Sequence, residues 1–469
     1  MTKITEDLNQ LANKIWDYAE TGFLETKSSA AMVQELEKEG FTITKGIAGM
    51  PTSYVGVWGS GKPVISFLAE YDALFSMNQK ADIEHYEPVT ASEDTGHGCG
   101  HNLLGTGAIY AAILYKNYLE ENKLGGTVKI FGCPAEESGS GKAYLAREGF
   151  MNDTDIALTW HPSNYNQVCT GSSQSCISVF YKFHGVSSHA ASAPQLGRSA
   201  LDACELMNIG VNYLREHMED CDRIHYAYLN AGGKAPNVIP SEAILKYFIR
   251  SETNSKCTSL YKRVNDVARG AALMTGCSVD IVFDEGLSNT VPNFVIEDVL
   301  ADSFAKLYKD TYTPEEREYA KRFKETYELN NVLSDLPKFA KDKQRIRKNI
   351  EGSEIHDYFM ETQHSDVCEM GSTDVGDISW VVPTGQINTA CYSHGAGAHT
   401  WQWVTQGKSS IAHKGYQLAG EVMADAAKTF HDNPELIAKA KKELADRLQE
   451  ESYQCLIPID IKPHVSNLE

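Results

Sequence analysis

The sequence has 469 residues, of which 42% are hydrophobic and 23% are charged, a composition typical of a globular protein with two domains. The formal net charge of −20 argues against binding to nucleic acid or to an anionic membrane, because both require clustered Lys and Arg side chains. The 11 cysteines lack the spacing of a disulfide framework, the N-terminal residues lack a secretion signal, and no apolar run is long enough to span a bilayer. We therefore expect a cytoplasmic protein with reduced cysteines.

The first part of the chain predicts alternating helices and strands. Apolar residues at three- and four-residue spacing predict a helix over 8–19, and Ser28 is a candidate N-cap for a second helix that ends at Gly40. A third helix is predicted from the glycine-rich turn at 96–102 to about residue 121. Strands are predicted at 52–58, 64–69, 127–132 and 155–160. This pattern favours an α/β sheet, in which ligands bind beyond the carboxyl ends of the strands.

From about residue 176 the predicted order changes to β-α-β-β-α-β, which is the ferredoxin-like split unit. The predicted elements lie at 176–184, 198–218, 224–231, 242–250, 257–274 and 277–283. Because such a unit can fold alone, we expect residues 176–285 to form an inserted domain. Residues 1–175 and 286–469 are then expected to form one discontinuous domain around it.

The chain is predicted to return with a helix near 293–309. A charged, helix-prone stretch follows at 314–365, which we interpret as a solvated insertion. The motif Gly371 to Asp377 is expected to lead into a strand at 378–382. The last predicted elements are a strand at 387–392 and helices at 409–430 and 434–450.

Two motifs place metal-binding side chains at the ends of predicted elements. Cys99 and His101 lie in a turn whose glycines allow both side chains to reach one centre. Glu136 and Glu137 follow a mostly apolar strand, and two adjacent carboxylates in a crevice need a cation or a proton for compensation. A buried packing cysteine and a solvated glutamate pair are the alternatives. Zinc is the usual metal for such a mixed donor set.

Histidines supply the remaining candidate ligands. His161 stands at the end of a predicted strand, where a core histidine is the alternative interpretation. His399 lies in a Gly/Ala-rich turn that suits close approach of a ligand, and His394 competes with it in the same turn. For His97 we expect a role in the turn rather than in binding.

These motifs occur in an order that resembles the aminoacylase/carboxypeptidase-type dinuclear metallopeptidases, in the branch of amidohydrolases that cleave N-acyl and auxin–amino acid conjugates. The matching motifs are Leu68 to Leu74, Gly96 to Leu104, Pro134 to Glu137, Gly139 to Lys142, Trp160 to Pro162, Gly185 to Ala191, Leu196 to Ala203, Pro236 to Pro240, Ser372 to Asp377 and Ala398 to Gln402. The resemblance implies a catalytic α/β domain with a mixed sheet flanked by helices. It also implies that the ferredoxin-like insertion is a lid that mediates dimerisation.

The resemblance further implies two divalent metal ions, zinc or manganese, and a general base, Glu136. The implied metal ligands are Cys99, His101, Glu137, His161 and His399. The sequence departs from many relatives in one position. They carry a metal-binding histidine two residues before the aspartate that matches Asp72, and here this residue is Glu70. Whether Glu70 touches metal is left open by the sequence.

Further residues have implied roles around this centre. His189 is the candidate donor to the tetrahedral oxyanion, contributed by a partner subunit, with an inconsequential surface histidine as the alternative. Asn237 and Arg250 suit recognition of a substrate carboxylate, although Arg250 could equally be a surface charge. Asp72 and Asp374 are expected to orient a histidine or a water molecule.

The expected reaction is hydrolysis of an amide between an acyl or aroyl group and an amino acid, with p-aminobenzoyl-glutamate as the leading substrate. A dipeptidase or an N-acyl-amino acid deacylase would use the same site. A non-catalytic metal-binding partner subunit and a metal-dependent regulatory protein are the alternatives outside this reaction class. We expect a homodimer, and a heteromer with a sister subunit is the alternative.

Overall fold

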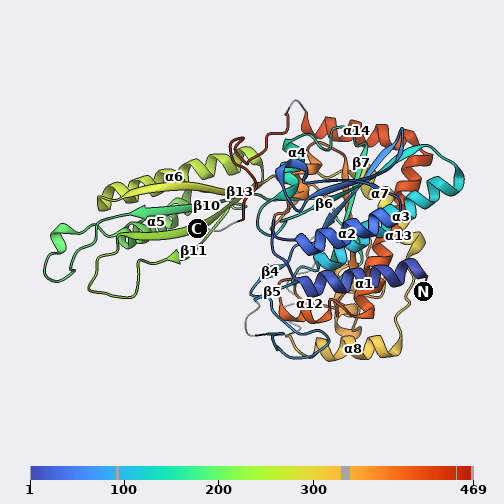
Figure 1. The fold of residues 1–469 in the computed structure, drawn as a ribbon, viewed down its shortest axis with the longest axis horizontal. Coiled ribbons are helices and arrows are strands. Elements are labelled where there is room, and N and C mark those ends of the chain that lie inside the picture. Colours follow the sequence, from blue (N-terminus) through green and yellow to red (C-terminus); the bar gives the residue numbers. More distant parts are fainter. Residues whose placement is uncertain (1, 91–93, 329–338, 450, 466–469) are drawn as a thin grey trace.

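The computed structural model describes residues 2–90, 94–328, 339–449 and 451–465. It consists of a large body and a long arm that projects from it (Figure 1). The body contains a seven-stranded mixed sheet, and the arm contains a four-stranded antiparallel sheet. The predicted fold class, a mixed α/β body interrupted by a ferredoxin-like unit, is therefore confirmed.

The strand order of the body sheet places the carboxyl ends of several strands at one edge. The order is β1 (Thr42–Lys45), β2 (Tyr54–Ser60), β6 (Gly126–Cys133), β3 (Val64–Glu70), β7 (Ile156–Ser163), β15 (Thr384–Ala390) and β8 (Gln167–Val168). Strands β6, β3, β7 and β15 run parallel to one another, whereas β1, β2 and β8 pair antiparallel. Parallel strands of this kind are buried on both faces, and β3 is buried along its whole length.

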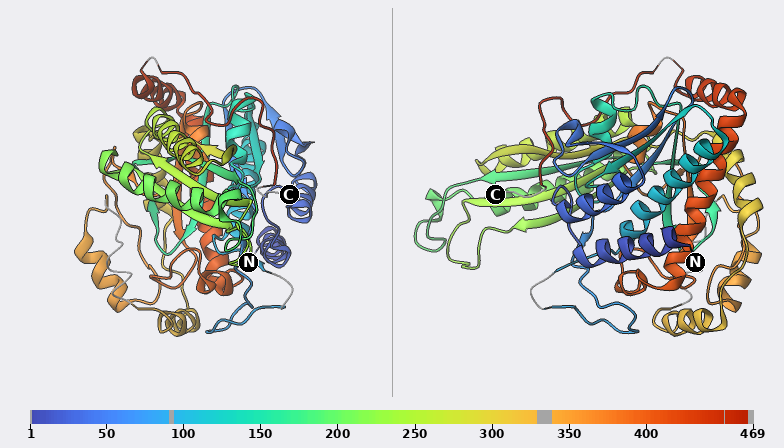
Figure 2. Two further views of the ribbon diagram at one scale, coloured as in Figure 1. Left: turned by 90° about the vertical axis from the view of Figure 1, so that its left-hand side faces the viewer. Right: turned by 45° about the vertical axis from the view of Figure 1, so that its right-hand side comes forward.

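Helices cover both faces of this sheet, and the right-hand view of Figure 2 shows the larger group beside it. One face packs on α1 (Lys3–Tyr18), α2 (Thr26–Lys38), α3 (His101–Asn122), α7 (Phe294–Leu307), α13 (Ser410–Asp432) and α14 (Pro434–Leu448). The other face packs on α4 (Gly141–Arg147) and α11 (Val375–Ser379). Alternate residues of β3 point to the two sides, since Phe67 joins the first cluster and Leu68 joins the second.

Helix α3 lies very close to the sheet because of a glycine. A Cβ atom on Gly107 would approach the indole ring of Trp160 to 2.7 Å, so the helix packs directly on this ring. The indole N–H of Trp160 donates to the carbonyl oxygen of Leu104, at 2.8 Å. This close packing fixes the start of α3 relative to β7.

Two local predictions are wrong. Helix α2 begins at Thr26 rather than after Ser28, because the Glu20 carboxylate accepts the backbone N–H groups of Lys27 and Ser28 in its first turn. Residues 378–382 do not form a strand: α11 ends at Ser379, and Ile378 and Val382 are both buried at the i, i+4 spacing of a helical turn. A short apolar run does not distinguish a strand from a buried helical turn.

The arm has the ferredoxin-like order of elements and its own hydrophobic core. Its elements are β10 (Ser175–His184), α5 (Ala200–Leu214), β11 (Arg223–Asn230), β12 (Glu242–Ser251), α6 (Asn254–Thr275) and β13 (Ser278–Leu287). The sheet order is β11-β12-β10-β13, and buried residues of α5 and α6 pack on one face of the sheet. The loops that follow β10 and β11 lie at the far tip of the arm (Figure 1).

The described part of the 314–365 stretch packs on the body through apolar side chains and is not solvated throughout. Its helices are α8 (Pro314–Lys324) and α10 (Lys343–Gly352), and residues 329–338 lie outside the described residues. Phe323 and Ile350 are fully buried, and Ala320 packs with Ile411 of α13. The remaining short elements are β4 (Leu74–Phe75), β5 (Thr95–Gly96), β9 (Ser172–Ser173), β14 (Cys368–Glu369) and α12 (Trp401–Gln406), and 3₁₀ turns at Ile47–Gly49, Pro194–Leu196 and Arg215–His217.

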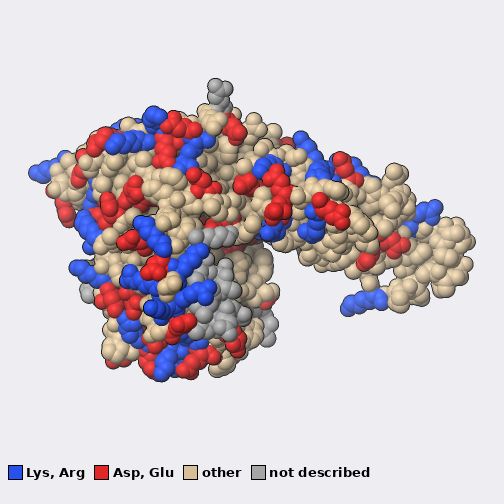
Figure 3. Space-filling view, turned by 180° about the vertical axis from the view of Figure 1, so that it is seen from behind, with Lys and Arg blue, Asp and Glu red and all other residues tan. Residues whose placement is uncertain are grey.

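Acidic and basic side chains are interspersed over the face of the body shown in Figure 3. Within the described ranges, no helix is both long enough and apolar enough to cross a bilayer.

Two buried histidines lie where the 314–365 stretch contacts the turn after β15. His356 belongs to that stretch, and His394 belongs to the turn. Their ring centroids are 5.2 Å apart, and the ring of Tyr165 packs edge-on against both. The Nδ1 atom of His356 accepts the backbone N–H of Asn166, at 3.1 Å. Burial, together with the charge of Lys324, lowers the pKa of His394 to about 3, and burial lowers the pKa of His356 well below its ordinary value. Both rings are therefore neutral in the folded protein at pH 7.

We predict that this pair makes the protein sensitive to acid. Below the ordinary histidine pKa of 6.5 the unfolded chain takes up protons that the buried rings do not, so the free energy of unfolding falls as the pH falls. Urea unfolding with EDTA at pH 7.5 and pH 5 should show a smaller loss of stability in His394→Asn than in the wild type. The exposed His217→Asn variant is the control and should lose as much stability as the wild type. An equal loss in His394→Asn would contradict this prediction.

Candidate metal centre

The predicted donor side chains meet at the carboxyl edge of the body sheet. Cys99 lies in the turn before α3, and His101 is the first residue of α3. Glu136 and Glu137 follow β6, and His161 lies near the end of β7, which continues beyond the predicted strand to Ser163. The turn before α3 requires a glycine at residue 100, where φ is +79° and a Cβ atom would lie 2.2 Å from the Tyr392 hydroxyl.

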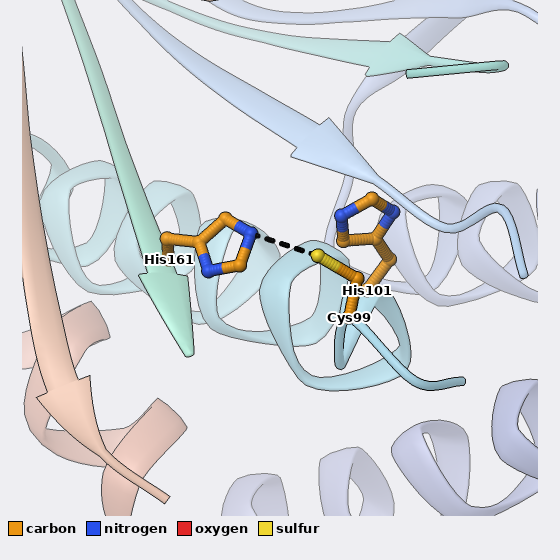
Figure 4. A group of neighbouring side chains, drawn as sticks. All are labelled: Cys99, His101 and His161. Atoms are coloured by element: carbon orange, nitrogen blue, oxygen red, sulfur yellow. Dashed lines mark hydrogen bonds between the residues drawn. The ribbon is translucent and has the colours of Figure 1, made fainter. Parts of the chain in front are cut away.

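The structure brings all five predicted ligands together in two overlapping sets. The candidate ligand atoms of Cys99, His101 and His161 all lie within 4.8 Å of one another, and so do those of Cys99, Glu137 and His399. The sulfur of Cys99 is 3.3 Å from Nε2 of His161, and Figure 4 shows these two side chains pointing toward each other beside His101. Cys99 belongs to both sets, so a thiolate could be shared between two ions.

Asp72 orients two of these donors from behind. Its Oδ1 atom accepts from Nδ1 of His101, at 2.8 Å, and its Oδ2 atom accepts the backbone N–H of Glu137, also at 2.8 Å. The carboxylate oxygen accepts in this contact, so Nδ1 of His101 carries a hydrogen and Nε2 is the ring atom that faces the other donors. His161 is held in the same tautomer, because its Nδ1 donates to the carbonyl oxygen of Pro162 at 2.7 Å.

Three buried atoms at the centre lack hydrogen-bond partners among the described residues. They are Nε2 of His101, Oε2 of Glu70 and Oε1 of Glu137. A buried polar group left in this state costs about 1–3 kcal/mol. Sulfur, imidazole and carboxylate donors that converge in this way suit a divalent cation, and zinc or manganese fits this mixture.

The charges of the acidic residues respond to burial and to one another. Burial, followed by the charges of Glu70 and Glu137, raises the pKa of Glu136 well above its ordinary value. Burial would also raise the pKa of Glu137, but the contact with His399 and the charge of His101 bring this pKa below its ordinary value. Nε2 of His399 lies 3.5 Å from Oε1 of Glu137, although the His399 side chain is 51% exposed.

Asp374 is at this centre but bonds to a lysine for which the sequence predicted no function. The Nζ atom of Lys142 lies 2.5 Å from Oδ1 of Asp374 and 2.6 Å from Oε1 of Glu70, and all three side chains are buried. Asp374 also accepts the backbone N–H of Lys142. Both oxygens of Asp374 thus orient a lysine, whereas the expected partner was a histidine or a water molecule. The Gly139 to Lys142 motif was the available signal for this contact.

The other candidate histidines lie outside the donor sets. Nε2 of His97 pairs with the carbonyl oxygen of Ile15 at 3.0 Å, which fits a structural role in the turn. His394 belongs to the buried pair with His356, and the structure places His399 rather than His394 beside Glu137.

The three residues expected to bind substrate or oxyanion lie on the arm. His189 and Asn237 are located in neighbouring loops at its tip, where the backbone N–H of Ala190 donates to the carbonyl oxygen of Asn237. The tip points away from the body, so the structure does not bring these two residues to the donor sets of the same chain (Figure 1). Arg250 lies at the base of the arm and donates to the Ser372 hydroxyl, at 2.6 Å.

Comparison with known proteins defines the class. Residues 67–454 match the sequence model of Peptidase family M20/M25/M40, so the chain belongs to this family and is a hydrolase. It is 38% identical over 461 residues to a p-aminobenzoyl-glutamate hydrolase subunit of Escherichia coli, a match that covers 97% of this chain and 95% of the relative. It is 30% identical to the Xaa-Arg dipeptidase of Mus musculus, over 64% of this chain and 68% of the relative.

A solved structure from Bacillus subtilis, described as a dinuclear metal-binding peptidase of the M20 family, superposes with a TM-score of 0.55. It is 15% identical and covers 92% of this chain and 99% of the other. At this identity the likeness shows a shared fold.

We predict that Asp72→Asn weakens metal binding roughly 10- to 100-fold, the usual effect of changing a residue behind the ligands. The amide of asparagine has only one acceptor oxygen. It can accept from either Nδ1 of His101 or the N–H of Glu137, and its NH₂ group then faces the other donor. Competition with a chromophoric chelator measures the affinity. Asp155→Asn is the matched control, because Asp155 is also buried and accepts a backbone N–H, that of Val64, at the opposite edge of the sheet. Equal affinities in the wild type and Asp72→Asn would disprove the assigned role.

Proposed function

We propose that this hydrolase uses two divalent ions to cleave an amide between an acyl or aroyl group and an amino acid, with p-aminobenzoyl-glutamate as the leading substrate. The observation that carries the proposal is the convergence of five donor side chains, from distant parts of the chain, on overlapping sets that share Cys99. The 38% identity with a p-aminobenzoyl-glutamate hydrolase subunit supports the choice of substrate.

The metal centre in this proposal is formed by Cys99, His101, Glu137, His161 and His399. Zinc and manganese both suit these donors, and the cysteine favours zinc. When bound, such ions polarise the carbonyl of the scissile amide and lower the pKa of water.

Glu136 is the proposed general base. It takes a proton from the attacking water and returns it to the nitrogen of the leaving amine, which departs as the amino acid. The turn that carries it is held in place at the preceding residue, because the backbone N–H of Ala135 donates to Glu25 at 2.8 Å and Ala135 has a φ of 58°. A positive φ at a residue other than glycine is held only by its surroundings. The base therefore sits on a rigid turn beside its metal-binding neighbour.

The arm is the proposed lid, with domain limits at residues 176–285, and the remaining residues 1–175 and 286–469 form the catalytic domain. His189 donates a hydrogen bond to the tetrahedral oxyanion, and Asn237 and Arg250 bind the substrate carboxylate. Because His189 and Asn237 lie at the tip of the arm, they act in the active site of a partner subunit. Arg250 lies near the body and acts in its own chain.

The proposed assembly is a homodimer through the lid. Strand β11 is an edge strand of the arm sheet, and Tyr226, Tyr228 and Leu229 on it are exposed by 42%, 36% and 52%. An exposed edge with apolar side chains is a surface on which a second strand pairs. Pairing with a sister subunit is the alternative. The cysteines of the described ranges form no disulfide with one another, which supports a reducing, cytoplasmic location.

A dipeptidase is the second candidate function, supported by the 30% identity with an Xaa-Arg dipeptidase. A metal-binding subunit without activity is less well supported, because a structural site has no use for a spare carboxylate such as Glu136 beside Glu137. A panel of p-aminobenzoyl-glutamate, N-acetyl-amino acids and dipeptides, assayed with zinc and with manganese, separates these candidates. No turnover of any of them by metal-loaded protein would contradict the proposal.

We predict that Glu136→Gln retains both metal ions and loses measurable hydrolysis, because the amide has the same size but cannot accept the proton. Metal content by mass spectrometry and turnover of p-aminobenzoyl-glutamate are the two measurements. Glu297→Gln is the control for altering a buried carboxyl outside the donor sets and should keep wild-type turnover. Retained turnover in Glu136→Gln would remove this residue from its role.

We also predict that two inactive variants restore each other. His189→Ala and Glu136→Gln chains are each inactive, but in a mixed dimer one active site combines an intact Glu136 with the intact His189 of the other subunit. Random pairing of equal amounts, after co-refolding, should give about one quarter of the wild-type activity. If the mixture stays as inactive as the separate variants, His189 does not act across the dimer.

A further inference from the structure

Glu70 ends strand β3 at the metal centre, and its two carboxylate oxygens have different surroundings. Oε1 lies 2.6 Å from Nζ of Lys142. Oε2 is buried, accepts no hydrogen bond from the described part of the chain, and lies 3.3 Å from Nε2 of His101. The side chain is thus anchored through one oxygen while the other points toward the donors.

The anchor is rigid because the lysine is held on its other side. Nζ of Lys142 lies 2.5 Å from Oδ1 of Asp374, whose second oxygen accepts the backbone N–H of the same lysine. The side chains of Lys142 and Asp374 have no exposed surface, and that of Glu70 is 3% exposed. One ammonium between two carboxylates leaves excess negative charge in a buried region, which is costly unless a further cation compensates.

The contact between Glu70 and His101 points to where that cation lies. Asp72 accepts from Nδ1 of His101, so Nε2 is the ring atom that faces Oε2 of Glu70. A contact between a carboxylate oxygen and this nitrogen is attractive only when a positive charge lies between them, which is either a proton or a metal ion. Candidate ligand atoms of Glu70, His101 and Glu136 all lie within 4.8 Å of one another, so a single ion would lie within reach of all three side chains.

We propose that Glu70 is a further ligand of the metal centre and contributes Oε2 to an ion that His101 also binds. This inference rests on the proposed function only in requiring that the centre holds divalent ions. It adds a sixth protein donor to the five derived from the sequence motifs. It also gives a role to the position at which this sequence departs from relatives with a histidine.

The test compares zinc binding by the wild type and by Glu70→Gln. Glutamine keeps the size of the side chain and an oxygen for Lys142, but it removes the negative charge and places an amide where Oε2 was. The wild type should bind two zinc ions per chain. Glu70→Gln should keep one ion and bind the other more than about 100-fold more weakly, a larger loss than changes behind the ligands cause.

A second measurement needs no variant. In a crystal structure of the zinc-loaded wild type, anomalous scattering at the zinc edge locates the ions, and Oε2 of Glu70 should lie about 2.0–2.2 Å from one of them. This result supports the proposal even if Glu70→Gln does not fold.

Glu297→Gln is the matched control, because Glu297 is a buried carboxyl on α7 outside the donor sets, and this variant should bind two ions as the wild type does. Two ions bound with wild-type affinity by Glu70→Gln, or Oε2 of Glu70 beyond about 3 Å from both ions, would overturn the inference and leave the proposed function intact. A wild type that binds no zinc and no manganese would instead overturn the proposed function as well.

Discussion

The buried carboxylate of Asp72 is the interaction on which the candidate metal centre depends. It accepts Nδ1–H of His101 with one oxygen and the backbone N–H of Glu137 with the other, so it joins the start of α3 to the turn after β6. This double contact keeps a hydrogen on Nδ1 of the histidine and turns Nε2 toward the donors from the other strands. Without this contact, nothing would direct the His101 and Glu137 side chains toward the same point.

Close packing in the body of the protein keeps the donor side chains in position. The carboxyl ends of strands β3, β6, β7 and β15 lie on the same side of the sheet. Residues at or just beyond these ends form the metal centre and the side chains around it. The glycine at residue 107 lets α3 lie against the ring of Trp160, which neighbours His161 on β7. A shift of α3 relative to β7 would disrupt this packing. The packing therefore restrains the distance between Cys99 and His161.

In the proposed enzyme, the arm contributes residues to the active sites of two chains. Its base carries Arg250, which contacts Ser372 of the body, whereas its tip carries His189 and Asn237 away from the body. A rigid ferredoxin-like unit with its own core can carry such residues over a distance without losing their relative positions. The exposed edge strand β11 offers a surface that could bring the tip of one chain to the centre of another.

Local periodicity and short motifs at strand ends were sufficient to predict the order of elements in the body and the arm. They also named the candidate donors, but only the resemblance to a known family favoured His399 over His394. They were not sufficient for residues 378–382, since a run of five apolar or small residues is compatible with either a strand or a helical turn. The packing of distant segments placed Lys142 between Glu70 and Asp374, and it buried His394 while leaving His399 to reach Glu137. Lys142 and Asp374 are 232 residues apart, and an ion pair across such a separation arises from the folded arrangement of the chain, which no local pattern encodes.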